Sequence, residues 1–220
     1  MEFMTIEEMR QHEWVISWSG GKDSTATIIL CHEYGIPIKK IVYVRMMYDE
    51  NLPATLPVMT DFVDKTKEVF ENWGYPVEIV KGKQTAMDIA RKVYFKSVNE
   101  HKNGNYYGVS QFIRGTCYFQ RVKPATIKML QNEKEYELIG YASDEVERIG
   151  RLTDTKQSIL LTLEVKEVDT FDICRKYNLL SPLYDLGIKR DGCWFCPNAG
   201  VRERAYLRTN YPELVKRLMI

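Results

Sequence analysis

The loop Ser-Gly-Gly-Lys-Asp-Ser at residues 19–24 holds the residues with the clearest chemical potential. Glycine has no Cβ and accepts positive φ, so the backbone N–H groups of such a loop can converge on a phosphate. A helix that starts there directs its positive end at the same anion. Lys22 adds a mobile positive charge, and Ser24 and Thr25 add hydroxyl donors. We therefore expect this loop to hold the phosphates of a nucleotide.

Asp23 beside a phosphate has two interpretations: it is an N-terminal helix cap, or it is a ligand of Mg²⁺ that bridges the phosphates. The alternative for the whole loop is a tight turn without a ligand, because short glycine patterns also occur by chance. The glycines lack the Walker spacing, which disfavours a P-loop kinase or GTPase.

We assign nucleotide binding to Ser17, Ser19, Gly20, Gly21, Lys22, Asp23, Ser24, Thr25, Val44, Lys123 and Gly140, and catalysis to Asp23, Lys22 and Arg148.

Two of these assignments have a competing surface interpretation. Arg148 follows a predicted strand end, where its guanidinium fork suits a phosphate, but a solvated salt bridge to Asp144 or Glu147 explains it nearly as well. Lys123, with Arg121, either contacts pyrophosphate or lies on the surface of a helix.

The cysteines are five in number, too few and too unevenly spaced for the disulfide framework of a small secreted domain. Cys193 and Cys196 form a Cys-x-x-Cys pair, whose sulfurs can converge on one metal ion or cluster. One pair cannot complete a site. A knuckle without metal and a thiol–disulfide pair are the alternatives. Cys31 lies on an apolar helix, and we assign it to the core.

The elements that must position these residues alternate between strand and helix. Strands are predicted at residues 13–18, 36–45, 75–80 and 136–141, and helices at 24–34, 60–73, 86–98 and 122–130. Residues 159–168 are interpreted as a strand, 171–177 as a short helix, and 99–116 as a loop over a site. The alternation predicts an α/β fold with a doubly wound, Rossmann-like parallel sheet, in which ligands bind at the carboxyl ends of the strands.

The 220-residue chain is long enough for one sizeable core, and we predict a nucleotide-binding α/β domain at residues 1–165. Residues 166–220 are expected to form a cysteine-containing segment packed on that domain. With 31 basic and 30 acidic residues, no global field attracts nucleic acid or a membrane. The chain also lacks a membrane-length apolar run and a signal-like start, so we expect a cytoplasmic protein.

Four stretches in chain order resemble the PP-loop ATP pyrophosphatases and, within them, the phosphoadenylylsulfate (PAPS) reductase family. The first is the Ser-Gly-Gly-Lys-Asp-Ser loop itself. The second is Cys-Tyr-Phe-Gln-Arg-Val-Lys-Pro at residues 117–124, and the third is Gly-Tyr-Ala-Ser-Asp-Glu-Val-Glu-Arg at 140–148. The fourth joins residues 181–187 to the Gly-Cys-Trp-Phe-Cys-Pro segment at 192–197. The resemblance implies an adenine nucleotide alpha hydrolase-like fold that binds ATP, or an adenylyl sulfonucleotide, with Mg²⁺.

The same resemblance extends the cysteine site. Cys117 corresponds to one of two adjacent cysteines in relatives that hold an iron–sulfur cluster, although Thr116 replaces the other. Cys117, Cys193 and Cys196 are then three ligands, and Cys174 is the candidate fourth. Four thiolates would form a closed 4Fe-4S or zinc site, whereas three would leave one iron open to bind sulfide, as the resembling tRNA thiolases do.

Two departures from the reductase pattern matter for function. Ala142 replaces an arginine that many members carry, and no cysteine follows Cys196 to serve as the reductase nucleophile. We therefore expect adenylation of an acceptor, with release of AMP and pyrophosphate from ATP. A sulfonucleotide reductase and a non-catalytic nucleotide-binding subunit remain the alternatives. The acceptor is unassigned. Nucleic acid is one candidate because Tyr206 and Tyr211 lie in a basic C-terminal stretch, but a solvated amphipathic helix is the commoner explanation of that stretch. A homodimer is an open option.

Overall fold

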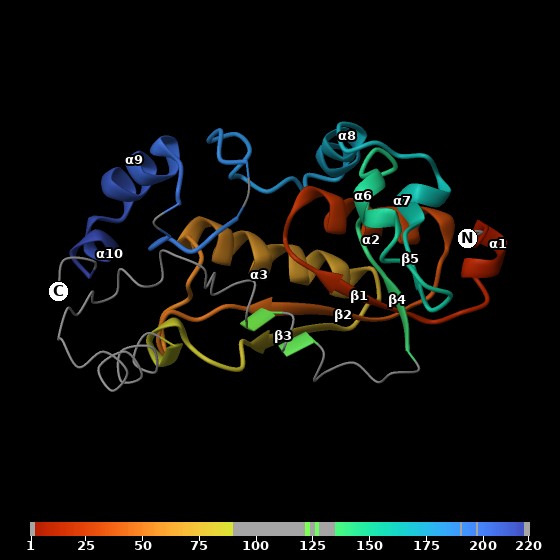
Figure 1. The fold of residues 1–220 in the computed structure, drawn as a ribbon, viewed down its shortest axis with the longest axis horizontal. Coiled ribbons are helices and arrows are strands. Elements are labelled where there is room, and N and C mark those ends of the chain that lie inside the picture. The colour runs from red at the N-terminus through yellow and green to blue at the C-terminus, as the bar shows by residue number, and fades with distance from the viewer. Residues whose placement is uncertain are drawn as a thin grey trace. The chain divides into compact units, whose positions relative to one another are not determined.

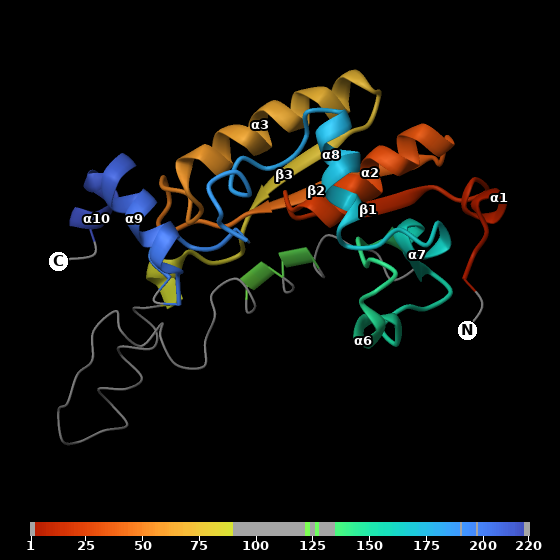
Figure 2. The ribbon, with the colours of Figure 1, turned by 90° about the horizontal axis from the view of Figure 1, so that it is seen from above.

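The computed structural model describes residues 3–89, 122–123, 126–127, 135–189, 191–196 and 198–217. The described chain divides into two compact units, whose elements can be followed in Figures 1 and 2. The first unit contains residues 3–43, 61–80 and 135–182, and the second contains residues 44–60, 81–89, 122–123, 126–127, 183–189, 191–196 and 198–217. The division expected at residue 165 stays a prediction, and residues 166–182 group with the first unit.

Five strands form one sheet in the order β3-β2-β1-β4-β5. Their bounds are β1 Trp14–Trp18, β2 Ile38–Arg45, β3 Val77–Lys81, β4 Tyr136–Leu138 and β5 Lys156–Gln157. β1 pairs in parallel with β2 and with β4, and β4 pairs in parallel with β5. The chain runs outward from β1 to β3 and then places β4 on the other side of β1, which is the reversal at which α/β sheets bind ligands. The predicted α/β fold with a parallel sheet is confirmed.

The helices of the described chain are mostly short. They are α1 Ile6–Met9, α2 Lys22–Tyr34, α3 Pro57–Asn72, α6 Val146–Ile149, α7 Ile159–Thr162, α8 Asp169–Lys176, α9 Val201–Asn210 and α10 Pro212–Lys216. Figure 1 shows α2, α3 and α8 on the same side of the sheet. The helices predicted at 24–34, 60–73 and 171–177 correspond to α2, α3 and α8. No helix in the described ranges is long and apolar enough to cross a membrane.

α2 is the central helix of the first unit. It packs against β1, α7 and α8, and its residues from Ser24 to Cys31 are buried on all sides. A helix covered on every face needs no polar stripe, which explains its run of threonine, isoleucine and leucine. It ends at Gly35, whose φ of 63° is the left-handed conformation that glycine accepts without a steric penalty.

The strand predicted at residues 159–168 is wrong. Only Lys156–Gln157 pair as β5, and Ile159, Leu160 and Leu161 begin α7, all of them buried. A short run of consecutive apolar residues fits a strand covered on both faces and a buried helical turn equally well, so periodicity did not separate them. Leucine favours helix, and the element ends before Glu164, whose φ is 55°.

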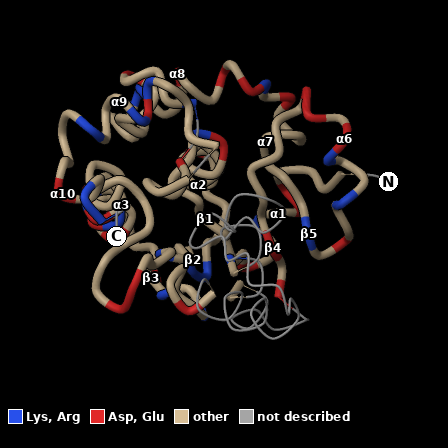
Figure 3. The backbone as a smooth tube through the Cα atoms, turned by 60° about the vertical axis from the view of Figure 1, so that its left-hand side comes forward, with Lys and Arg blue, Asp and Glu red and all other residues tan. Residues whose placement is uncertain are grey.

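The second unit contains the C-terminal helices. α9 and α10 pack together, and Tyr206 lies edge-on to Tyr211 with ring centroids 5.9 Å apart. Figure 3 shows basic and acidic residues interspersed along the described backbone. The basic residues Arg202, Arg204 and Arg208 of α9 are exposed, as expected of a solvated helix.

The helix predicted at 86–98 is observed from residue 86 to residue 89, and its remainder and the loop predicted at 99–116 lie outside the described residues.

Candidate functional site

The loop at residues 19–24 joins the carboxyl end of β1 to the first turn of α2. Gly20 has φ of 77°, a conformation that side chains with a Cβ rarely adopt. Gly21 is the N-cap of α2, and having no side chain it provides no capping hydrogen bond. The first N–H groups of a helix need an acceptor, and a helix start without an N-cap side chain is suited to an anion. The local sequence thus leaves the start of α2 without a capping side chain.

Two serines close the loop upon itself. The hydroxyl oxygens of Ser19 and Ser24 lie 2.9 Å apart, and the backbone N–H of Ser19 donates to the Ser24 hydroxyl at 3.1 Å. Ser24 also donates to the carbonyl of Gly21 at 3.1 Å, and the N–H of Gly21 donates to the Ser19 hydroxyl at 3.3 Å. These bonds fix the loop's shape in the free protein, so a ligand meets a preformed loop.

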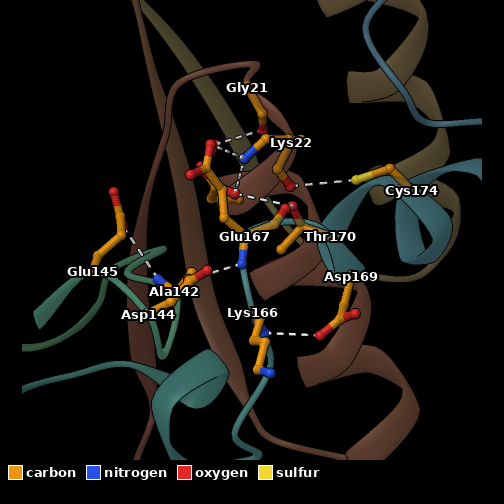
Figure 4. Close-up of polar contacts among 12 residues, drawn as sticks. Gly21, Lys22, Ala142, Asp144, Glu145, Lys166, Glu167, Asp169, Thr170 and Cys174 are labelled. Carbon is orange, nitrogen blue, oxygen red and sulfur yellow. Dashed lines mark hydrogen bonds and ion pairs between the residues drawn. The ribbon is translucent and has the colours of Figure 1, made fainter.

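Lys22 and Asp23 form a compact charge cluster with Glu167. The Lys22 Nζ lies 2.6 Å from Oδ1 of Asp23 and 3.0 Å from Oε1 of Glu167. Burial acts to lower the pKa of Lys22, but the hydrogen bonds to Asp23 and Glu167 outweigh it, and the pKa is raised. Lys22 is therefore charged at neutral pH. Figure 4 shows the Glu167 side chain directed toward Lys22 at the start of α2.

The segment around α8 packs against α2 and supports this cluster. Thr170 donates its hydroxyl hydrogen bond toward Oδ1 of Asp23 at 3.0 Å, and Cys174, one turn further along α8, donates to the carbonyl of Lys22 at 3.3 Å. Both side chains are fully buried. Burial raises the pKa of the Cys174 thiol to about 12, so it stays protonated as a donor. The N–H of Glu167 donates to Oδ1 of Asp144 at 2.9 Å, which anchors the segment's backbone.

Gly140 brings the end of β4 against the start of α2. A Cβ added at Gly140 would lie 2.7 Å from the carbonyl carbon of Asp23 and 2.7 Å from the nitrogen of Ser24. Real Cβ atoms are essentially never found that close to backbone atoms. The predicted site residue Gly140 therefore adjoins the loop at residues 19–24, and its lack of a side chain lets the two segments meet.

Other residues singled out from the sequence lie in the core, on β1 or in surface ion pairs. Thr25 is fully buried, and its hydroxyl accepts a hydrogen bond from the indole of Trp18 at 3.0 Å, so it faces the core. Ser17 is half-buried on β1. Arg148 pairs with Glu145 at 3.0 Å, whereas Asp144 and Glu147 were the partners considered from the sequence. Ala142, which replaces an arginine of the resembling reductases, is fully buried.

Val44 and Lys123 belong to the second unit. Val44 is a buried residue of β2. Burial lowers the pKa of Lys123, and the nearby carboxylate of Asp191 opposes that shift. Their assignment to the nucleotide stays a prediction.

Glu167 and Thr170 were missed by the sequence interpretation. Thr170 is 147 residues from Asp23 along the chain, and no short motif joins the two. The available signal was the predicted helix at 171–177, since a polar residue near a helix start in an α/β fold can meet a neighbouring helix start. That signal is weak without the topology.

The Cys-x-x-Cys pair lies in the second unit on an anchored turn. The N–H of Cys196 donates to the carbonyl of Cys193 at 2.8 Å, and Cys193 is buried. Between them, Trp194 donates its backbone N–H to Ala54 and its indole to Pro53. Cys117 lies outside the described residues. Within the described part of the chain, no three His, Cys, Asp or Glu side chains form a group that could hold a metal.

Comparison with known proteins gives a distant likeness of fold. No family model matches the chain, and no curated protein matches its sequence. The U34-tRNA thiolase NcsA from Methanococcus maripaludis, solved with its 4Fe-4S cluster, is similar at a TM-score of 0.46 and 16% identity, covering 95% of this chain and 70% of the thiolase chain. The NH3-dependent NAD synthetase from Campylobacter jejuni, solved with a nitrate ion, is similar at a TM-score of 0.37 and 12% identity. The match covers 94% of this chain and 78% of the synthetase chain.

Gly140→Ala tests the close approach of β4 to the loop. The added methyl must displace backbone atoms of Asp23 and Ser24, so we expect the free energy of unfolding to fall by about 1–3 kcal/mol, measured by urea denaturation. Gly150→Ala is the matched control, because Gly150 has φ of −63° and nothing within 4 Å of its added Cβ. Equal stability of the two variants would contradict the contact.

Proposed function

We propose that this chain is a PP-loop enzyme that binds the phosphates of ATP on residues 19–24 and adenylates an acceptor, releasing pyrophosphate. The observation that carries the proposal is the start of α2: a glycine N-cap, a preformed serine-closed loop and a charged lysine meet at the carboxyl end of β1, where the strand order reverses. Each of these features favours a phosphate ligand.

The proposed reaction assigns a role to each group of the loop. The acceptor attacks the α-phosphorus, the bond from that phosphorus to the bridging oxygen breaks, and pyrophosphate leaves with the electron pair. Backbone N–H groups of the loop orient the phosphates, and Lys22 exchanges its carboxylate partners for phosphate oxygens and stabilises the charge that develops on the leaving group. No step requires a protein nucleophile.

The Asp23 carboxylate fits a magnesium ligand. Lys22 and Thr170 both contact Oδ1, and among the described residues no hydrogen bond reaches Oδ2. Mg²⁺ is held in nucleotide sites by one or two carboxylates together with phosphate oxygens and water. When bound, Mg²⁺ would neutralise phosphate charge and thereby ease departure of pyrophosphate.

The alternative of a sulfonucleotide reductase needs a mobile thiolate that can reach sulfur. The buried, protonated Cys174 is held against the carbonyl of Lys22, and burial raises the pKa of the fully buried Cys31 thiol. These two buried thiols favour adenylation over reduction. We propose that the chain is related to the PAPS reductase family but adenylates an acceptor instead of reducing a sulfonucleotide.

We further propose that Cys117, Cys193 and Cys196 hold an iron–sulfur cluster or zinc. The anchored turn between Cys193 and Cys196 supports this proposal, because Trp194 fixes the turn through both its backbone and its indole. The candidate fourth ligand, Cys174, belongs to the first unit and is engaged by Lys22. Three ligands would leave an iron position available for sulfide, which would make sulfur the group that attacks the adenylated acceptor.

Nucleotide binding is tested by Gly21→Val. The branched side chain would occupy the place where the phosphate meets the helix start, so we expect affinity for α,β-methylene-ATP to fall about tenfold or more by calorimetry. Gly200→Val is the matched control, because Gly200 is the N-cap of α9 with φ and ψ of −65° and 163°, close to the −81° and 162° of Gly21. Unchanged affinity in a folded Gly21→Val protein would refute the proposed phosphate site.

The reaction type is tested by product analysis. We expect pyrophosphate from ATP when total RNA is supplied as a trial acceptor, and an equal amount of AMP once sulfide or ammonia displaces it from the adenylated acceptor. We expect no sulfite from PAPS with thioredoxin. Lys22→Ala should abolish pyrophosphate release, because Lys22 stabilises the leaving group. Sulfite release that disappears in Cys174→Ser would establish the reductase alternative, and nucleotide binding without any turnover would favour the non-catalytic subunit.

The cysteine site is tested by anaerobic purification followed by metal analysis and absorption spectroscopy. We expect bound iron or zinc in the wild-type protein and its loss in Cys193→Ser, because metal affinity depends on each thiolate ligand. Cys31→Ala serves as the control, since the fully buried Cys31 is assigned to the core and should keep the metal. Full metal content in Cys174→Ala would identify three protein ligands, and a metal-free, active wild-type protein would exclude the site.

A further inference from the structure

The Asp23 carboxylate is held from one side only. Its Oδ1 lies 2.6 Å from the Nζ of Lys22 and 3.0 Å from the Oγ1 of Thr170. Within the described chain, Oδ2 accepts no hydrogen bond, and the side chain of Asp23 is 27% exposed. A carboxylate bound at one oxygen has a fixed plane, so its second oxygen has a defined direction. This is the state in which a carboxylate can act as a ready ligand for a cation.

Of the two donors to Oδ1, Thr170 is the one that keeps its place under the proposed function. Thr170 is fully buried, and α8 packs against α2, so the hydroxyl stays beside Asp23 (Figure 4). Lys22 is held by Asp23 and Glu167, and under the proposed function its ammonium group turns from these carboxylates to the phosphates when nucleotide binds. Asp23 then loses one of its two donors at the moment when its orientation matters. The hydroxyl of Thr170 remains.

Thr170 has a second acceptor within reach, the carbonyl of Glu167 at 2.8 Å. A hydroxyl carries one hydrogen, so it favours the acceptor with the greater negative charge once Lys22 no longer neutralises Asp23. The release of Lys22 therefore strengthens the bond from Thr170 to Asp23. Thr170 then orients Asp23 in place of Lys22, and α8 does not have to move.

We propose that Thr170 is a positioning residue that orients the Asp23 carboxylate for Mg²⁺ when nucleotide binds. The proposal rests on the proposed function, in which Asp23 is the magnesium ligand. Thr170 acts on the ligand rather than on the metal, and residues that support a metal ligand in this way typically contribute about 10–100-fold to metal affinity. Its removal should affect metal dependence and leave metal-free nucleotide binding nearly unchanged.

The test measures binding of α,β-methylene-ATP by calorimetry as Mg²⁺ is titrated. We expect Thr170→Val to raise the half-saturating Mg²⁺ concentration about tenfold, and Thr170→Ser, which keeps the hydroxyl, to restore a value near that of the wild type. In an Asp23→Asn background, Thr170→Val should have no further effect, because the pair acts as one unit.

Thr27→Val is the matched control. Thr27 is also fully buried, and its hydroxyl donates to the backbone carbonyl of Asp23 at 2.9 Å instead of to the carboxylate. The same chemical change there removes a buried hydrogen bond to Asp23 without touching its side chain. We expect Thr27→Val to leave the Mg²⁺ dependence unchanged, even where it lowers stability.

The outcomes separate the inference from the function on which it rests. If the wild type binds no nucleotide, or binds it without any dependence on Mg²⁺, the proposed function fails and the role of Thr170 fails with it. If the wild type depends on Mg²⁺ and Asp23→Asn loses that dependence, but Thr170→Val keeps it, the inference alone is overturned. An equal shift in Thr27→Val would also overturn it, because the effect would then be structural.

Discussion

The parts of the first unit meet at the amino end of α2. A helix start exposes N–H groups and a partial positive charge, and Gly21 provides no side chain to cap them. The groups that surround this helix start come from three places: the serines of the loop, the acidic Glu167, and the neighbouring helix α8 with Thr170 and Cys174. β4 approaches the same point because residue 140 is glycine. The sheet order, the loop and α8 are thus coupled through one helix terminus.

Local patterns predicted the part of this arrangement that is local in sequence. The loop follows β1 directly and opens α2, so its glycines, lysine and serines could be assigned from residues 19–24 alone. The alternation of strands and helices predicted the parallel sheet, because each signal spans only about ten residues. Gly140 was also among the predicted residues, although the reason for its glycine became clear only from its contact with Asp23 and Ser24.

The remainder could not be predicted because it depends on topology. Lys22 is bound by a carboxylate far along the chain, and nothing in the spacing of Glu167 or Thr170 indicates such a partner. The apolar run at residues 159–161 was assigned to a strand, since burial of consecutive residues carries no period. Thr25 was assigned to the nucleotide for its hydroxyl, whereas Trp18 uses that hydroxyl to satisfy a buried indole. The type of a side chain indicates what it can bond, and the packing decides which partner it meets.

The shortness of α8 has a consequence for the energetics of the loop. An isolated helix of eight residues is marginal in water, so α8 exists because it docks on α2. The loop, in turn, takes two of its hydrogen bonds from α8. The two segments are distant in sequence but should open and close as a single cooperative unit, with similar protection of their amide protons from exchange. Anything that loosens α8 from α2 would therefore disorganise the start of α2 as well, and a ligand bound there would in return hold α8 in place.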